Sequence, residues 1–388
     1  MDSHHLAGRA QALPPSPIRR FFDLVQAIPD AISLSIGEPD FVTPWAAREA
    51  AIFSLERGGT HYTANRGTLE LRREIAAYLA RRFGLQYDPE TEIVVTVGGS
   101  EALDLANRAL LDPGDEVVVP EPCFVAYRPL VTLAGGVPVP VTTSVKDAFQ
   151  LSAAQITPHL GPKTKAILLG YPNNPTGATL GVERAREIAE VACRHDLVVL
   201  SDEIYAELTY GGEHVPLAAQ PGMRERTVLL SGFSKAFAMT GWRLGYAAGP
   251  EVIIDTMNKI HSYTIMCSST MAQRAAVEAL RSCDREVADM RRQYDWRRRV
   301  VLKRLNGMGL DCFEPRGAFY AFPSIASTGL TSTEFAERLL AEEKVAVVPG
   351  NAFGQCGEGY VRCSYATSLE LIEEAMRRMA AFVSRVRG

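Results

Sequence analysis

A lysine in a segment of small and apolar residues could act as a nucleophile. An apolar run at residues 228–230 predicts a strand, and Ser231, Gly232, Phe233 and Ser234 lead from it to Lys235. Such neighbours exclude water from an ammonium group, and desolvation lowers the pKa of a lysine. A neutral lysine amine attacks carbonyl groups and can form a Schiff base. On these residues alone, a surface lysine after a strand is an equal alternative.

A second segment could bind an anion. After a strand expected at residues 93–97, Gly98 and Gly99 turn the chain into a helix that we expect Ser100 to cap. Free amides and the dipole at the start of a helix suit a phosphate, although a plain capped turn is the alternative. Arg243 follows Lys235 by eight residues and could hold an anion with two hydrogen bonds, or form a surface ion pair.

Two further segments place polar side chains after expected strands. Asp202 follows the apolar run 197–200, and its carboxylate could pair with a ring cation or cap a helix. Tyr205 would lie one helical turn beyond it, facing the same site. Asn174 stands in the proline-bounded loop 170–177, where its amide offers both a donor and an acceptor, as it would in an ordinary turn. Because ligands bind at the carboxyl ends of strands in open α/β sheets, these segments predict one site.

The elements that must position this site alternate between strands and helices from residue 91 onward. Short apolar strands separated by helices predict an α/β fold with a mainly parallel sheet that is buried on both faces. We expect a three-layer α/β/α large domain over residues 46–285. We expect a smaller α+β domain from residues 286–388 together with residues 1–45, the latter including an N-terminal arm.

Strands of the smaller domain are expected at residues 309–313, 318–322, 345–348 and 360–364, with helices near 332–343 and 368–387. Residues 1–17 read as a flexible arm, and residues 18–28 have roughly helical spacing. A short strand is expected at 31–36. A helix over residues 44–57 is expected to be capped by Thr43, and an amphipathic helix covers 69–82.

Composition excludes several other classes of protein. The 388 residues are 47% hydrophobic and 22% charged, which is typical of a soluble globular protein. The net charge of −4 argues against nucleic acid as a partner. The sequence shows neither a secretory signal nor a membrane span. Seven cysteines without a C-x-x-C motif indicate neither a disulfide framework nor a metal site, and a cytoplasmic location fits best.

Taken in order, these segments resemble the fold-type-I pyridoxal-phosphate enzymes, in particular the class I/II aminotransferases. The matching elements extend from residues 37–41 to residues 362–368, nearly the whole chain. The resemblance implies pyridoxal 5'-phosphate as the cofactor. It also implies a ping-pong transfer of an amino group between an L-amino acid and a 2-oxo acid. A lyase that catalyses β- or γ-elimination is the enzyme alternative, and a binding or regulatory protein without turnover is a remote one.

The resemblance also assigns roles to residues of this chain. Lys235 would form the Schiff base and carry the Cα proton, and Asp202 would pair with the ring nitrogen. The remaining roles are these: Tyr205 and Asn174 at the ring 3-oxygen, Phe124 stacked on the ring, Gly99, Ser100 and Arg243 at the phosphate, Arg362 and Asn174 at the substrate, and Gly37 leaving room for that substrate. Tyr62 would reach the phosphate of the neighbouring subunit, which implies a homodimer with shared active sites.

One departure and one gap remain in this assignment. Many relatives carry a phosphate-binding serine three residues before the lysine, where this chain has Gly232, so Ser231 or Ser234 would have to replace it. The substrate side chain is poorly encoded. Arg66 and Lys259 are candidate partners for a distal carboxylate, whereas the loop 263–266 could line an apolar pocket. Aspartate, aromatic, alanine-like and diaminopimelate-type substrates all stay open.

Overall fold

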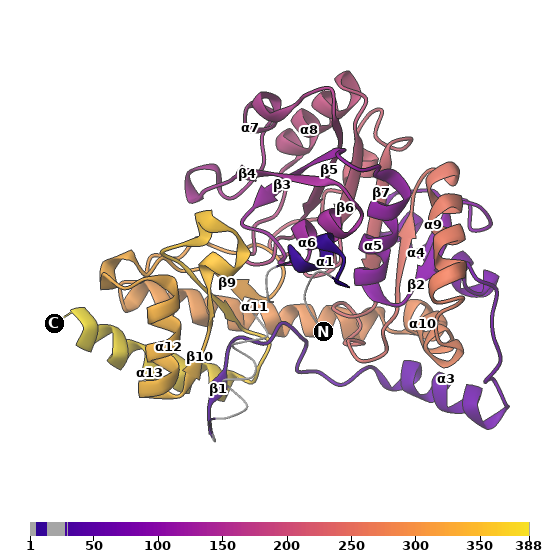
Figure 1. Ribbon diagram of the computed structural model, residues 1–388. Helices are drawn as coiled ribbons and strands as arrows, with labels where there is room; N and C mark the ends of the chain where they lie inside the picture. The colour runs from indigo at the N-terminus through magenta and orange to yellow at the C-terminus, as the bar shows by residue number, and fades with distance from the viewer. Residues whose placement is uncertain (1–4, 14–27, 29, 388) are drawn as a thin grey trace.

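A seven-stranded sheet forms the centre of the molecule in the computed structural model, which describes residues 5–13, 28 and 30–387 (Figure 1). The strand order is β2-β8-β7-β6-β5-β3-β4, and only β8 runs antiparallel to its neighbours. The strands are β2 (Ile93–Thr96), β3 (Glu116–Glu121), β4 (Val137–Thr142), β5 (Thr164–Gly170), β6 (Val198–Asp202), β7 (Thr227–Gly232) and β8 (Gly245–Ala248). The prediction of a mainly parallel α/β sheet is confirmed.

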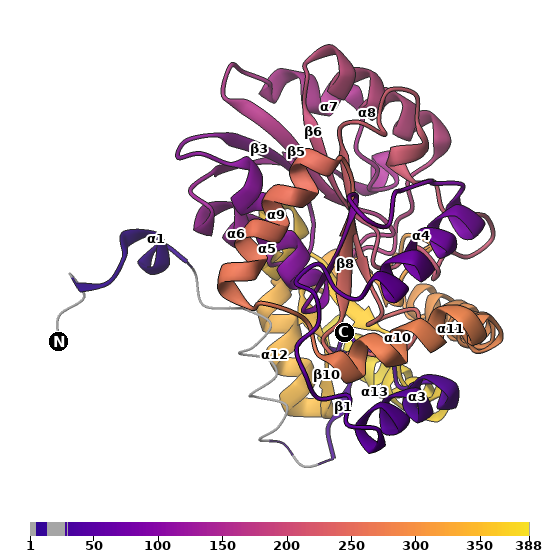
Figure 2. The same cartoon turned by 90° about the vertical axis from the view of Figure 1, so that its right-hand side faces the viewer.

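Helices cover both faces of this sheet, and alternate residues of its strands accordingly pack into two different apolar clusters. Leu168 and Leu200 pack in a cluster with residues of α5 (Gly98–Leu110), α6 (Tyr127–Leu133) and α9 (Glu251–Thr264). Ile167 and Val199 pack in a second cluster with α8 (Val182–Arg194). Figure 2 shows α5 and α9 on one side of β8 and α4 (Leu69–Phe83) on the other. The result is the expected three-layer arrangement.

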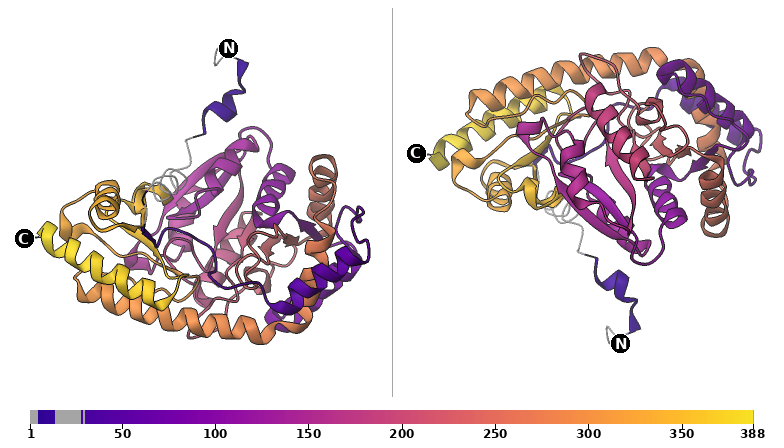
Figure 3. Two further views of the ribbon diagram at one scale, coloured as in Figure 1. Left: turned by 90° about the horizontal axis from the view of Figure 1, so that it is seen from below. Right: turned by 90° about the horizontal axis from the view of Figure 1, so that it is seen from above.

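A long helix, α11 (Asp284–Gly307), leads from the sheet to the C-terminal elements and runs beside α13 (Leu369–Arg387) (Figure 3). There β9 (Tyr320–Ala321), β12 (Val361–Ser364) and β11 (Val348–Pro349) form a small antiparallel sheet. The N-terminal β1 (Ile32–Ser33) pairs in parallel with β10 (Val345–Ala346).

The remaining helices are short or lie at the surface. α3 (Trp45–Glu56) packs against α10 (Thr270–Ser282), and α12 (Ser332–Glu343) packs against α13. The others are α1 (Gly8–Gln11), α7 (Ala153–Ile156), η2 (Val145–Asp147), η3 (Thr157–His159), η4 (Leu217–Ala219), η5 (Ala326–Thr328), η6 (Gly350–Phe353) and η7 (Gln355–Gly357). Within the described part of the chain, no helix is long and apolar enough to cross a membrane.

Several local predictions were wrong. The Thr43 hydroxyl donates to the Ala238 carbonyl at 2.6 Å instead of capping α3, whose N-cap is Pro44. Ser100 does not cap α5, because the helix already starts at Gly98.

Other differences concern element boundaries. Residues 309–313 contribute only an isolated bridge at Cys312, and residues 345–348 split into β10 and β11. Residues 204–207 form a turn, so Tyr205 follows Asp202 without an intervening helix. Part of the expected arm forms α1, while the helical spacing at 18–27 lies outside the described residues.

Candidate active site

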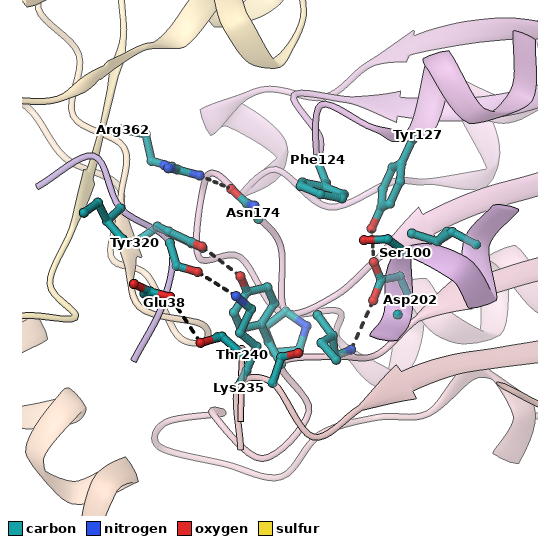
Figure 4. Close-up of a pocket in the computed structure, with 18 of the residues that line it drawn as sticks. Glu38, Ser100, Phe124, Tyr127, Asn174, Asp202, Lys235, Thr240, Tyr320 and Arg362 are labelled. Carbon is teal, nitrogen blue, oxygen red and sulfur yellow. Dashed lines mark hydrogen bonds between the residues drawn. The ribbon is translucent and has the colours of Figure 1, made fainter. Parts of the chain in front are cut away.

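A cavity of about 400 Å³ lies where β5, β6 and β7 end, and predicted residues from distant segments line it (Figure 4). Figure 4 shows Asp202 and Tyr127 on one side and Arg362 and Tyr320 on the opposite side. The predicted residues that line the cavity are Gly37, Gly99, Ser100, Phe124, Asn174, Asp202, Tyr205, Lys235, Arg243 and Arg362. Tyr62 is not among the lining residues and is 81% exposed.

Lys235 follows β7 and points its amine into the cavity. Its Nζ donates a hydrogen bond of 2.6 Å to the carbonyl oxygen of Gly37. Burial is the main cause, and the positive charge of Arg362 the second, of a pKa of Lys235 that is lowered to about 8. The amine therefore has a sizeable neutral fraction near physiological pH, which a nucleophile requires.

Asp202 is the last residue of β6, so the sheet holds its carboxylate at the cavity. Its Oδ2 accepts a hydrogen bond of 2.8 Å from the Tyr127 hydroxyl, and its Oδ1 accepts one of 3.2 Å from the Ile204 amide. Burial raises the pKa of Asp202 to about 6, although both hydrogen bonds oppose this shift. At neutral pH the carboxylate is mostly ionised, and it can stabilise a cation beside it.

The start of α5 and Arg243 form a cradle for an anion. The first amides of a helix lack partners within the helix, and its dipole is positive at that end. Gly98 has φ of +77°, and a Cβ there would lie 2.6 Å from Arg243 Nη2. Glycine thus lets the guanidinium approach the first turn of α5. Arg243 Nη1 is fixed by the Thr240 carbonyl at 2.9 Å.

The structure also explains the missing serine. A Cβ at Gly232 would lie 2.9 Å from both the Leu244 carbonyl oxygen and the Gly245 Cα. Because these are backbone atoms of the neighbouring strand, a serine would not fit without moving β8. Ser234 lines the cavity, whereas the Ser231 hydroxyl is directed to the Glu203 carbonyl at 3.4 Å. Ser234 is therefore the better placed of the two hydroxyls.

Arg362 lies in β12 on the side of the cavity opposite Asp202 and is only 2% exposed. It donates from Nη1 to Asn174 Oδ1 at 2.9 Å and from Nη2 to the Ser35 carbonyl at 2.6 Å. The guanidinium carbon lies 4.4 Å and 4.9 Å from the ring centres of Tyr320 and Phe353. A rigidly held guanidinium of this kind suits a planar carboxylate.

Two lining tyrosines escaped the sequence analysis. Tyr127 bonds Asp202, and the Tyr320 hydroxyl shares a hydrogen bond of 2.8 Å with that of Tyr205. Tyr320 also restricts position 37 to glycine, because a Cβ on Gly37 would clash with the Tyr320 hydroxyl oxygen. The position of Tyr127, three residues after Phe124, was the available signal. The contacts of Tyr320 depend on tertiary structure alone.

The candidates for binding the substrate side chain lie outside this cavity. Arg66 and Lys259 both pair with Asp255, at 2.8 and 2.9 Å. In the loop 263–266, Tyr263 is 93% exposed. Neither the two cations nor the loop lines the cavity of their own protomer.

The donor set fits pyridoxal 5'-phosphate. A guanidinium and a helix start suit its phosphate, a carboxylate suits its ring nitrogen, and an amine between them suits its aldehyde. The glycine at position 98 lets the guanidinium of Arg243 lie against the start of α5, where the two together suit a phosphate. Each chemical end of this cofactor therefore has a complementary group in the cavity.

Comparisons with known proteins agree with this geometry. The chain matches the family Aminotransferase class I and II over residues 29–379. It is 55% identical over 381 residues to a protein of Bacillus subtilis (strain 168) named "Putative aminotransferase YugH", and the match covers 98% of this chain and 99% of that one. It is 48% identical to Aromatic-amino-acid aminotransferase 2 of Thermococcus litoralis, with 96% and 97% covered. The aspartate aminotransferase from Thermus thermophilus with maleate superposes with a TM-score of 0.93 at 40% identity, with 98% and 100% covered.

The chain therefore belongs to the class I and II aminotransferases. It is a pyridoxal-phosphate-dependent aminotransferase of fold type I, which confirms the family, the cofactor and the reaction class predicted from the sequence.

Proposed function

We propose that Lys235 holds the cofactor covalently and carries the substrate's Cα proton in this aminotransferase, with Asp202 and Arg362 in supporting roles. The observation that carries this proposal is that a buried amine, a carboxylate and a guanidinium share one cavity. When bound, pyridoxal phosphate withdraws electrons from Cα of the amino acid, which acidifies the Cα proton.

The proton steps follow from two shifted pKa values. With a pKa near 8, the Lys235 amine can accept a proton and return it at neutral pH, as a general base and acid must. Asp202 would hold a proton at the ring nitrogen, because its ionised carboxylate favours a cation there. Tyr127 keeps that carboxylate oriented through the hydrogen bond of 2.8 Å.

Substrate orientation would come from Arg362 and its neighbours. The guanidinium would bind the α-carboxylate in two hydrogen bonds, beside the amide of Asn174. Tyr205 and Asn174 would donate to the ring 3-oxygen, and Phe124 would stack on the ring. Because Arg362 would hold the carboxylate in place, it would fix which bond of Cα stands perpendicular to the ring. This favours loss of the Cα proton over loss of the carboxylate.

We propose uncharged, preferably aromatic, amino acids as the donors. The cations lining the cavity within the described chain are Lys235, Arg243 and Arg362, and each already has a role. The carboxylate of Glu38 also lines it, and it would repel an acidic side chain. Apolar and aromatic residues make up much of the remaining wall: Ile36, Leu103, Phe124, Tyr127, Pro172, Ile204 and Tyr320. The aromatic aminotransferase of Thermococcus litoralis is consistent with this choice.

An amino-donor panel with 2-oxoglutarate as acceptor tests the substrate class. We expect kcat/KM for phenylalanine and tyrosine to exceed that for aspartate by about ten-fold or more, which corresponds to about 1.4 kcal/mol, because the cavity of the described chain leaves no cation for the distal carboxylate. Arg66→Ala and Lys259→Ala are assayed with the same donors, because these two residues are the candidate partners for the distal carboxylate of aspartate. If aspartate is preferred and either variant removes that preference, a cation from the partner subunit defines the substrate and the proposal is wrong.

We further propose a cytoplasmic homodimer. Several large apolar side chains are exposed on α3, namely Trp45, Ile52, Phe53 and Leu55. A patch of this kind is typical of an interface between subunits. The exposed Tyr62 is then available to reach the phosphate of the partner's cofactor.

The proposed division into a large domain over 46–285 and a small domain from 1–45 and 286–388 is supported by two contacts. The strand β1 pairs with β10, far along the chain. In addition, α11 and α13 pack together outside the central sheet.

A further inference from the structure

The first turn of α5 is held by a residue that the proposed chemistry does not use. Val97, the N-cap residue, provides no side-chain hydrogen bond to the helix. Glu101 compensates for this, because its Oε2 accepts a hydrogen bond from the Val97 amide. Glu101 therefore fixes the backbone on which Gly99 and Ser100 line the cavity.

The other oxygen of Glu101 is held by a distant helix. Glu101 Oε1 lies 2.7 Å from Nδ1 of His261 in α9. The His261 side chain is fully buried and that of Glu101 is 11% exposed. The Nε2 atom of His261 is buried and has no hydrogen-bond partner in the described structure. The hydrogen bond between Nδ1 and Glu101 is therefore the polar contact that stabilises this buried ring.

We propose that Glu101 and His261 are positioning residues for the cofactor phosphate, an inference that rests on the proposed phosphate site at the start of α5. Glu101 is the acidic residue in the first turn of this helix. A carboxylate there is attracted to the same free amides as a phosphate. His261 holds this carboxylate against α9 and the Val97 amide, and so leaves the amides of Gly99 and Ser100 to the phosphate.

Replacing His261 releases the competing carboxylate. In His261→Leu, Glu101 loses its buried partner and can turn toward the amides of the first turn. We expect the dissociation constant of pyridoxal phosphate to rise about ten-fold, which corresponds to about 1.4 kcal/mol. Pyridoxal, which has the ring and aldehyde but no phosphate, should bind wild type and variant with dissociation constants that differ by less than about two-fold, that is, by less than about 0.4 kcal/mol.

The experiment dialyses holoenzyme to equilibrium against a series of cofactor concentrations, and repeats the titration with pyridoxal after the phosphate form has been removed. His195→Leu, at the exposed end of α8, is the matched control and should bind like wild type. The double variant Glu101→Gln/His261→Leu removes the competing charge, so most of the phosphate-specific loss should disappear.

Three results would overturn the inference: unchanged pyridoxal-phosphate binding in His261→Leu, an equal loss for pyridoxal, or no recovery in the double variant. If His261→Leu does not fold, His261→Gln and Glu101→Asp replace it. The first keeps a donor for Glu101 and should bind like wild type. The second shortens the reach to both partners and should show the phosphate-specific loss. A wild-type protein that binds both compounds equally would instead contradict the phosphate site itself.

Discussion

Lys235 and Arg362 are two cations that share one small cavity, and each affects the other. The guanidinium is the second cause, after burial, of the low pKa of Lys235. The same residue that would bind the substrate's carboxylate thus helps to keep the amine neutral. Substrate binding would neutralise Arg362 and weaken this effect, which would raise the basicity of Lys235 when it must accept a proton.

The pH dependence of cofactor association tests this electrostatic link. Because the neutral amine reacts with the aldehyde, and the pKa is about 8, the association rate should rise about ten-fold per pH unit below 8 and level off above it. In Arg362→Leu the loss of a positive charge favours the protonated amine, so the midpoint should move to higher pH. Stopped-flow absorbance on cofactor-free protein measures both profiles.

A small amine reacting with the same aldehyde provides the control, because it corrects for ionisation of the cofactor itself. Lys235→Ala should give no covalent phase. A midpoint near the ordinary lysine value, or one that Arg362→Leu leaves in place, would contradict the proposed link between the two cations.

At this scale, the sequence was informative where a polar residue lies at or shortly after the carboxyl end of an apolar strand. Asp202 ends β6, Asn174 and Lys235 lie four and three residues beyond β5 and β7, and all three line the cavity. Tyr320 could not be recognised in this way, because its partners Tyr205 and Arg362 come from distant segments. Its place in the apolar run 318–322 indicates burial only.

At the scale of elements, the limits of buried strands could be predicted from the sequence, but the direction of a strand within the sheet could not. The apolar runs 197–200 and 228–230 predicted strands close to the observed β6 and β7, since both faces of these strands are buried. The antiparallel direction of β8 depends on its neighbours β2 and β7. The helix start at Gly98 was missed because a serine two residues later looked like a cap, whereas the first turn is held by Glu101.

The end of β6 offers a stability test that is separate from the catalytic residues. Glu203 follows Asp202, and its carboxylate is 2.7 Å from His214 Nε2 and 2.9 Å from the Ser201 hydroxyl. The side chains of His214 and Glu203 are 6% and 3% exposed. His214→Leu leaves a buried carboxylate without its main partner, so we expect a loss of about 3 kcal/mol in the free energy of unfolding.

Urea unfolding of the cofactor-saturated protein measures this loss. The double variant Glu203→Gln/His214→Leu removes the unpaired charge and should recover a large part of the stability. His195→Leu, which changes an exposed histidine in the same way, should unfold like wild type. Equal unfolding free energies for His214→Leu and the double variant would show that the carboxylate does not carry the effect.

At the scale of the whole molecule, the cavity of a single chain lacks the predicted contact of Tyr62 with the cofactor phosphate. Ten of the predicted residues line its cavity, but Tyr62 does not. No sequence pattern could decide whether Tyr62 serves its own cavity, because in the proposed homodimer this depends on the arrangement of two chains. The exposed apolar residues of α3 are the physical reason to expect a second copy.

Subunit sharing predicts a result that a monomer cannot give. Sedimentation should show twice the 42.4 kDa mass of one chain. In a tagged heterodimer of wild type with Lys235→Ala, the wild-type cavity still receives Tyr62 from its partner, so its cofactor affinity should match that of the wild-type homodimer. With Tyr62→Phe/Lys235→Ala as the partner, the same cavity loses that hydroxyl, and its affinity should fall to that of the Tyr62→Phe homodimer. Because the wild-type subunit is identical in both heterodimers, equal affinities would mean that Tyr62 does not act across the interface.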